Sequence, residues 1–253
     1  MGLTIHWNWH GPKSRNEAKA VVEKMRQRAL DLPFESVSEV VQFEGDDARF
    51  DLAKRDDEFG WLKVQSRQSV WNKEGTVGWD CLPKEIVGLQ ILVAPGSEPM
   101  EVILGTYPKT IEVTDRQTGK TKRIRTGFQD WLGRGFCKTQ YASDPACGGI
   151  RNFLRAHLSV CRMLDYAKEF GLVVEVSDEG GFFEKRDISA LAKTVGEWNE
   201  QIAAFVGALT DKLGKPVMAP IQNFPDFEQL EAKGQNQIDA FLRALKDEKG
   251  SAG

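Results

Sequence analysis

The sequence predicts an α+β fold in which a mixed, largely antiparallel sheet is covered by an N-terminal helix and by C-terminal helices. Three observations predict it. A strand pattern and an amphipathic helix open the chain, the middle third reads as a series of β segments, and the last third carries long helical patterns around one short strand. No flexible polar linker divides the 253 residues. We therefore expect one domain over 1–253, with at most a loose division into a β-rich lobe, 1–135, and a helix-rich lobe, 136–253.

The N-terminal segment shows strand and helix signals in succession. Residues 3–10 (LTIHWNWH) are rich in β-branched and aromatic side chains, which favour a strand. Ser14 and Glu17 then form the Ser-x-x-Glu capping box that opens a helix, and Pro33 ends that helix. A second strand pattern follows over 36–43. Together these elements predict a β-α-β unit.

The middle third alternates short apolar runs with turn residues, which is typical of a β-meander or of extended hairpins. The last two runs flank 116–119 (RQTG), a turn in which glycine can adopt a positive φ. We expect strands over 61–71, 85–94, 100–107, 110–115 and 120–126.

The final third is dominated by apolar residues at helical spacing. Long helices are expected over 145–170 and 187–214, the second of them capped by Asp187. Between them, 172–176 (LVVEV) predicts a short buried strand. A last helical region is expected over 225–249, interrupted at Gly234.

Composition and charge limit the partners and the location. The formal net charge of −3 supplies no basic field for RNA or DNA, so a nucleic acid is not an expected partner. The N-terminus has neither the basic nor the apolar region of a signal peptide, and no apolar run approaches the ~20 residues that span a bilayer. We expect a soluble, cytoplasmic protein without a membrane partner, whose four cysteines are free thiols.

Three blocks of the chain resemble a known family. The blocks are ALDLPFE at 29–35, FCKTQYAS at 136–143 and EVSDEGGFFEKRD at 175–187. They are similar to those of a family of uncharacterised bacterial proteins. The resemblance implies a bacterial, cytosolic origin and carries over no activity and no catalytic residue.

The segment 136–149 is the first candidate site. It carries Lys138, Tyr141 and Cys147 as candidate catalytic groups, and Gly148 and Gly149 as candidate ligand-binding residues. If the helix begins at Pro145, its dipole favours the Cys147 thiolate, although the Asp144 carboxylate opposes that effect. Two consecutive glycines near a helix start indicate close approach to the backbone, either by another part of the protein or by a ligand.

The segment 178–184 is the second candidate site. Asp178, Glu179 and Glu184 are candidate catalytic carboxylates, since paired acids can act as general acid and base. The alternative is a Gly-Gly turn surrounded by surface charges. A helix that is followed by a short turn and a strand packs back along that strand, so we expect the two candidate segments to lie side by side.

Histidines supply the remaining candidates. His6 and His10 lie on one face of the first strand, with Trp7 and Trp9 on the other. They stand about 13 Å apart on an extended strand, which is too far for one metal ion, so a pocket-lining role in ligand binding is favoured. His157 and Cys161 share a helical face but lie in an apolar stripe, which indicates a structural role. No metal site and no cofactor is predicted.

Two classes of function stay open at this point. The first is an intracellular binding or interaction module for a small ligand or a protein partner. It is favoured because the sequence shows no complete set of catalytic residues. The second is a small-molecule enzyme, a hydrolase or transferase, with a polar pocket formed by segments 136–149 and 178–184. A concave pocket that joins these two segments would favour the enzyme.

Overall fold

The computed structural model describes residues 3–51, 56–72, 75, 77–114, 119–214 and 219–237. It confirms the α+β class with a largely antiparallel sheet. Every strand pair of the described residues is antiparallel. The main sheet has seven strands. Five of them follow one another in the spatial order β11 (Val173–Asp178), β1 (Thr4–His10), β10 (Leu132–Lys138), β7 (Met100–Thr106) and β6 (Glu85–Leu92). The other two, β2 (Ser36–Val37) and β3 (Val41–Glu44), both pair with β6.

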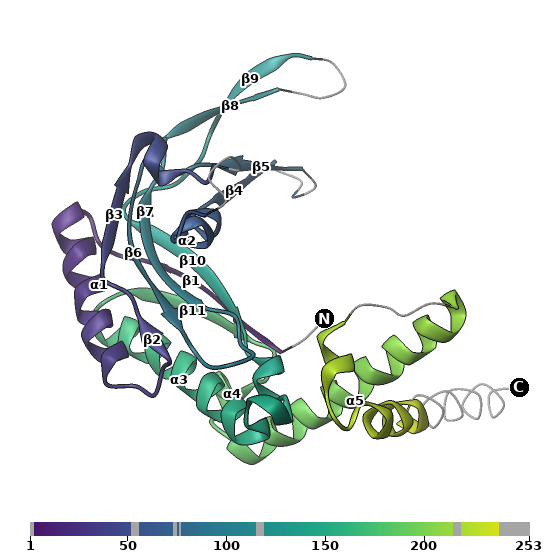
Figure 1. Cartoon of the computed structure of the whole chain (residues 1–253). Coiled ribbons are helices and arrows are strands. Elements are labelled where there is room, and N and C mark those ends of the chain that lie inside the picture. The colour runs from purple at the N-terminus through teal and green to yellow at the C-terminus, as the bar shows by residue number, and fades with distance from the viewer. Residues whose placement is uncertain are drawn as a thin grey trace, which may run out of the picture.

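Helices cover one face of this curved sheet and leave much of the other open. The helices α1 (Arg15–Leu30) and α3 (Gly149–Glu169) lie on the outer face, whereas the short α2 (Gly60–Gln65) lies inside the curve (Figure 1). The main core fills the layer between the sheet and α1 and α3. Its fully buried members include Ile5, Trp7, Trp9, Val22, Met25, Leu89, Met100, Phe153 and Leu164.

The N-terminal helix forms as its sequence predicts, but the prediction of a β-α-β unit is wrong. The Ser14 hydroxyl accepts a hydrogen bond from the Glu17 N–H and caps α1. However, β10, β7 and β6 separate β1 from β2 in the sheet. The strand that follows α1 therefore joins the far edge of the sheet, because the central positions are filled by strands from later in the chain.

The predicted strand over 61–71 is wrong in its first half, which forms the helix α2. The helix places Leu62 over Gly88 of β6, where a Cβ would approach Leu62 Cδ1 to 3.2 Å. Leu62 joins Ile86 and Ile103 in a small second core on the inner face of the sheet. Only the second half is a strand, β4 (Gln68–Trp71), which pairs with β5 (Gly78–Cys81).

The strand β10 was not predicted, because Gly133 and Gly135 weaken its strand pattern. Both glycines make room for indoles of β1. A Cβ at Gly133 would stand 1.9 Å from the carbonyl oxygen of Ile103 and 2.5 Å from Trp9 Nε1, which donates a 2.7 Å hydrogen bond to that oxygen. The glycines are thus required by contacts with Trp7, Trp9 and the backbone of Ile103, all of which are distant in the sequence.

The β8 (Thr110–Thr114) and β9 (Thr121–Arg125) strands form the predicted hairpin, whose residues 115–118 lie outside the described part. The strand β11 is at the edge of the sheet rather than buried, and Val173 is 55% exposed. Among the described residues, no helix combines the length and the hydrophobicity that crossing a bilayer requires.

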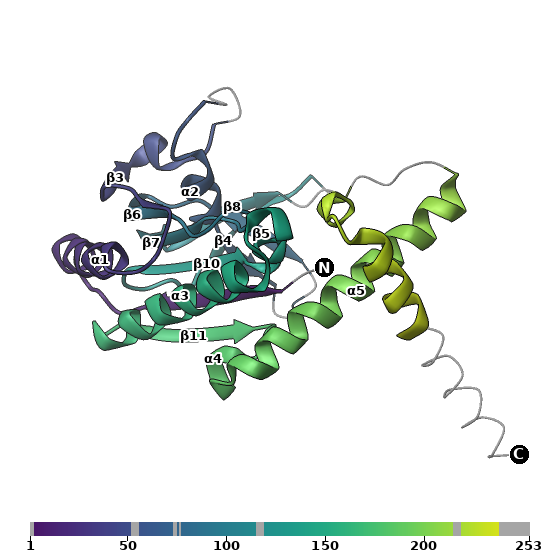
Figure 2. The same cartoon turned by 60° about the horizontal axis from the view of Figure 1, so that its bottom comes forward.

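The second long helix agrees with its prediction. It is α5 (Ile188–Leu213), capped by the Asp187 side chain and ended by Gly214. Its C-terminal half projects away from the sheet (Figure 2) and packs against the turn η4 (Pro220–Asn223). Residues 227–237 are helical, and the rest of the predicted region to 249 lies outside the described residues.

Candidate functional site

The polar residues of segment 136–149 mostly hold the fold together. The Gln140 side chain accepts a hydrogen bond from the Leu3 N–H at 3.0 Å and donates one to Asn199 Oδ1 at 2.9 Å. The Thr139 hydroxyl lies 2.9 Å from Nδ1 of His157. Since all of these side chains are buried, their hydrogen bonds join the start of β1 to α3 and α5.

Cys147 is not placed for activation by a helix dipole. The helix α3 begins at Gly149 rather than at Pro145, and Asp144 caps a separate single turn, Pro145–Cys147. Burial raises the pKa of the Cys147 thiol, and the charge of Asp144 raises it further. The predicted start of the helix is therefore wrong, and the thiol is held in its less reactive form.

Gly148 and Gly149 are explained by backbone conformation. Their φ angles are +106° and +65°, a region that other residues rarely adopt. A Cβ at Gly149 would meet nothing within 4 Å, and one at Gly148 would meet only the side chain of Asn152. Neither close packing by another element nor an approaching ligand is needed to account for the pair.

The side chain of Asp178 is buried, and both of its carboxylate oxygens accept hydrogen bonds. Its carboxylate accepts hydrogen bonds from the N–H groups of Gly180 and Phe183, each at 2.8 Å, and lies 3.1 Å from Nε2 of His157. Burial alone would raise the pKa of Asp178, but the hydrogen bonds and the charge of His157 outweigh it and hold the pKa below its usual value. The result is a buried chain of Thr139, His157 and Asp178.

The other candidates of the two segments are spread apart. Glu179 accepts a hydrogen bond from the Thr4 N–H at 2.9 Å, Lys138 Nζ lies 4.6 Å from the ring centroid of Tyr141, and Glu184 is exposed on the short helix Phe182–Lys185. The strand β1 separates β10 from β11 in the sheet, and a path of hydrogen bonds connects the two segments from Thr139 through His157 to Asp178. None of the six candidate catalytic residues lines either of the clefts described next.

His157, Cys161 and Asp178 also have the spacing of a metal site. One ligand atom from each lies within 4.8 Å of the others. However, hydrogen bonds already occupy both ring nitrogens of His157 and both carboxylate oxygens of Asp178. Burial raises the pKa of Cys161 strongly and disfavours the thiolate that a metal requires. The structural interpretation of this cluster is the better one.

The open face of the sheet gathers a different set of polar side chains. His6, Asn8 and His10 point away from the core, while Trp7 and Trp9 point into it, as predicted. The strand register places Asn8 between Arg134 on β10 and Glu175 on β11. Three neighbouring strands therefore present polar groups in one row.

A cleft of about 390 Å³, here called the α2 cleft, lies between this face and α2. Aromatic rings form much of its wall, because Trp61 of α2 meets Phe136 edge-on at 6.2 Å and His6 lies 5.9 Å from the same ring. Its lining comprises His6, Trp7, Asn8, Trp61, Val64, Gln65, Arg134, Gly135 and Phe136.

Polar groups without partners distinguish the α2 cleft. Gln65 is 5% exposed, and neither atom of its carboxamide has a hydrogen-bond partner among the described residues. Leaving such a group buried and unpaired costs about 1–3 kcal/mol. Over the same described ranges, no hydrogen bond or ion pair engages the side chains of Asn8 or Arg134. The cleft therefore offers amide and guanidinium groups whose hydrogen bonds are still to be made.

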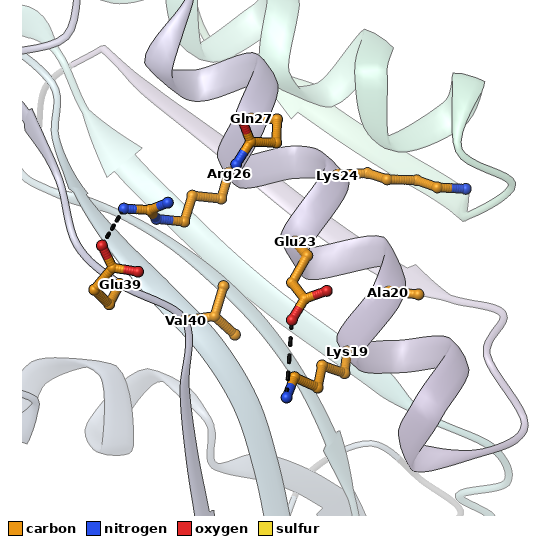
Figure 3. A pocket seen from close by; sticks show the side chains of 8 residues that line it. All are labelled: Lys19, Ala20, Glu23, Lys24, Arg26, Gln27, Glu39 and Val40. Carbon is orange, nitrogen blue, oxygen red and sulfur yellow. Dashed lines mark hydrogen bonds and ion pairs between the residues drawn. The ribbon is translucent and has the colours of Figure 1, made fainter.

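A second cleft of about 440 Å³ continues from Asn8 along β1 to His10, with Gln68, Phe128 and Glu175 in its wall. A further surface hollow lies between α1 and the chain at Val40 (Figure 3). There Lys19 pairs with Glu23 at 3.8 Å and Arg26 pairs with Glu39. The other polar side chains of this hollow, Lys24 and Gln27, are exposed to solvent, unlike the buried carboxamide of Gln65.

No family model, curated protein or solved structure matches this chain. The site is therefore defined by geometry alone. Sequence reasoning identified His6, His10 and Asn8 as sharing a face. It missed Trp61, Gln65 and Arg134, because they lie on a helix and a strand that the sequence pattern did not predict.

Proposed function

We propose that this chain is a binding module that holds a small molecule in the α2 cleft. The buried carboxamide of Gln65, which has no hydrogen-bond partner among the described residues, is the observation that carries the proposal. Native structures rarely leave both polar atoms of a buried amide without partners, and a ligand would supply those partners. The volume of about 390 Å³ lies within the range of small-molecule sites.

The enzyme alternative has less support. A hydrolase or transferase with its pocket between 136–149 and 178–184 needs free acids or a reactive nucleophile there. Asp178 instead accepts three hydrogen bonds, Glu179 binds the backbone of Thr4, and the pKa of Cys147 is raised. These groups stabilise the fold and are not free for catalysis, so binding without catalysis is the better proposal.

Origin and location remain proposals from the sequence. The resemblance to uncharacterised bacterial proteins favours a bacterial source. The cysteine usage and the net charge of −3 favour the cytoplasm and argue against a nucleic-acid partner.

A thermal-shift screen of a small-metabolite library tests the binding proposal. Compounds that stabilise the wild type should lose most of their effect in Gln65→Leu and in Asn8→Leu, which remove polar groups of the cleft. Gln27→Leu is the matched control, since Gln27 is exposed on α1, across the sheet from the cleft, and should leave the shifts unchanged. A library in which no compound depends on Gln65 and Asn8 would reject the α2 cleft as a ligand site.

A further inference from the structure

We infer that the ligand of the α2 cleft is a flat aromatic carboxylate, in which Arg134 binds the carboxylate and the ring lies against Trp61 and Phe136. The inference rests on the proposed function and narrows it to a chemical class. Three independent properties of the lining support it: its charge, its aromatic wall and its buried amide.

The charge of the cleft favours an anion. Arg134 is the one side chain with a permanent charge among the described residues that line the cleft, and none of them is acidic. In the part of the chain that the structure describes, Arg134 forms no ion pair. A half-buried guanidinium presents a planar fork of donors that matches a carboxylate in a bidentate arrangement.

Two neighbouring acids lie outside the lining of the cleft. Glu175 on β11 is opposite Asn8 in the strand register, but it is exposed and lines the second cleft instead. Glu101 on β7 lies on the same side of the sheet as Ile103. Its carboxyl is completely buried, accepts a 2.7 Å hydrogen bond from Gln90 Nε2 and does not line the cleft. Glu101 therefore does not occupy the position of the ligand carboxylate.

The aromatic wall favours a flat apolar body. Trp61 is 40% exposed although it lies on a helix that packs on the sheet, and its indole meets Phe136 edge-on. Edge-to-face and offset contacts between aromatic rings stabilise a bound ring beyond the stabilisation that comes from burying its surface. A third ring, His6, also contacts Phe136, with the ring centroids 5.9 Å apart. An aliphatic chain or an inorganic ion would leave this wall exposed to water.

The buried amide indicates a second polar group on the ligand. The Gln65 carboxamide can both donate and accept, so a hydroxyl on the ring would satisfy it. A ring with a carboxylate at one end and a hydroxyl elsewhere would bind both Arg134 and Gln65, and Asn8 would be a further polar contact in the same lining. Phosphate monoesters share the affinity for arginine, and the experiment below separates them from carboxylates.

The test measures dissociation constants by isothermal titration calorimetry for five probes: benzoate, benzamide, cyclohexanecarboxylate, phenyl phosphate and inorganic phosphate. Benzoate should bind most tightly, by ~10-fold or more over neutral benzamide, as expected for a charge-assisted hydrogen bond. Arg134→Gln should remove that preference. Arg134→Lys keeps the positive charge but lacks the planar guanidinium, so it should retain only part of the preference for benzoate.

The matched control is Arg123→Gln on the β8–β9 hairpin, which should bind benzoate as the wild type does. Unfolding midpoints of all variants show whether they fold. Equal binding of benzoate and benzamide, tighter binding of either phosphate, or no binding by any probe overturns the aromatic-carboxylate assignment. The cleft itself is rejected only if the metabolite screen also yields no compound that depends on Gln65.

Discussion

The indole of Trp7 lies directly against the backbone of Gly135 on the neighbouring strand, and a Cβ at position 135 would stand 2.5 Å from Cζ2 of that ring. The register pairs these two residues. It also pairs Trp9 with Gly133, where a Cβ would meet both the Trp9 indole and the Ile103 carbonyl oxygen. The indoles fill the main core on one side of the sheet, while the backbone of Gly135 and the side chain of Arg134 form the floor of the α2 cleft on the other.

Gly135→Ala should therefore destabilise the protein by ~1–3 kcal/mol or more, because the indole has to leave a packed position. Urea unfolding monitored by circular dichroism measures the change. Gly196→Ala is the matched control, since a Cβ at this position inside α5 meets nothing within 4 Å. That variant should be more stable by up to about 1 kcal/mol, from helix propensity. Wild-type stability in Gly135→Ala would disprove the packing described here.

Asp178→Asn should cost ~2–4 kcal/mol at pH 7, since it removes a buried charge that His157 and two backbone N–H groups stabilise. The folded-state pKa of Asp178 is lowered, so its contribution is present above the unfolded pKa of ~3.9 and is lost as the pH falls through the folded pKa. The difference between the variant and the wild type should therefore shrink below about pH 4. Chemical unfolding at pH 7, 5 and 3 measures it, and a difference that is constant with pH would contradict the lowered pKa.

Glu101→Gln should change how stability depends on pH. Burial raises the pKa of Glu101 to about 7, although the hydrogen bond from Gln90 lowers it. An unfolded glutamate ionises near pH 4.3, so the wild type loses stability as the pH rises from there to about 7. The variant cannot ionise at this position. It should match the wild type near pH 4 and exceed it at pH 8 by an amount on the order of 3 kcal/mol.

Urea unfolding of both proteins at pH 4, 6 and 8 makes this comparison. Glu112→Gln, on the exposed β8–β9 hairpin, should show no such divergence. An advantage of Glu101→Gln that is the same at every pH would show that Glu101 does not titrate between pH 4 and 8.

Gln65→Leu should stabilise the ligand-free protein. The substitution keeps the approximate shape of the side chain and removes two buried polar atoms that have no partner among the described residues. The expected gain is ~1–3 kcal/mol, the cost of a buried unsatisfied group. Thermal unfolding without added ligand measures it. A destabilised Gln65→Leu would indicate that the carboxamide makes hydrogen bonds within the folded protein.

Local sequence patterns predicted the elements whose signals lie within a few residues. The caps at Ser14 and Asp187, the β8–β9 hairpin and the faces of β1 all follow from such patterns. The α2 cleft could not be predicted in this way. Its Arg134 lies on a strand whose glycines are set by distant tryptophans, and its Gln65 lies on a helix whose position depends on Gly88.

Nuclear Overhauser effects from a bound probe test the central claim most directly. The ring protons of benzoate, or of the tightest compound from the screen, should show contacts to the indole of Trp61 and to the ring of Phe136. Spectra of Trp61→Leu assign the indole signals. Contacts only to residues outside the α2 cleft, such as Val40 and Ala20 of the hollow in Figure 3, would contradict the assignment of the α2 cleft as the ligand site.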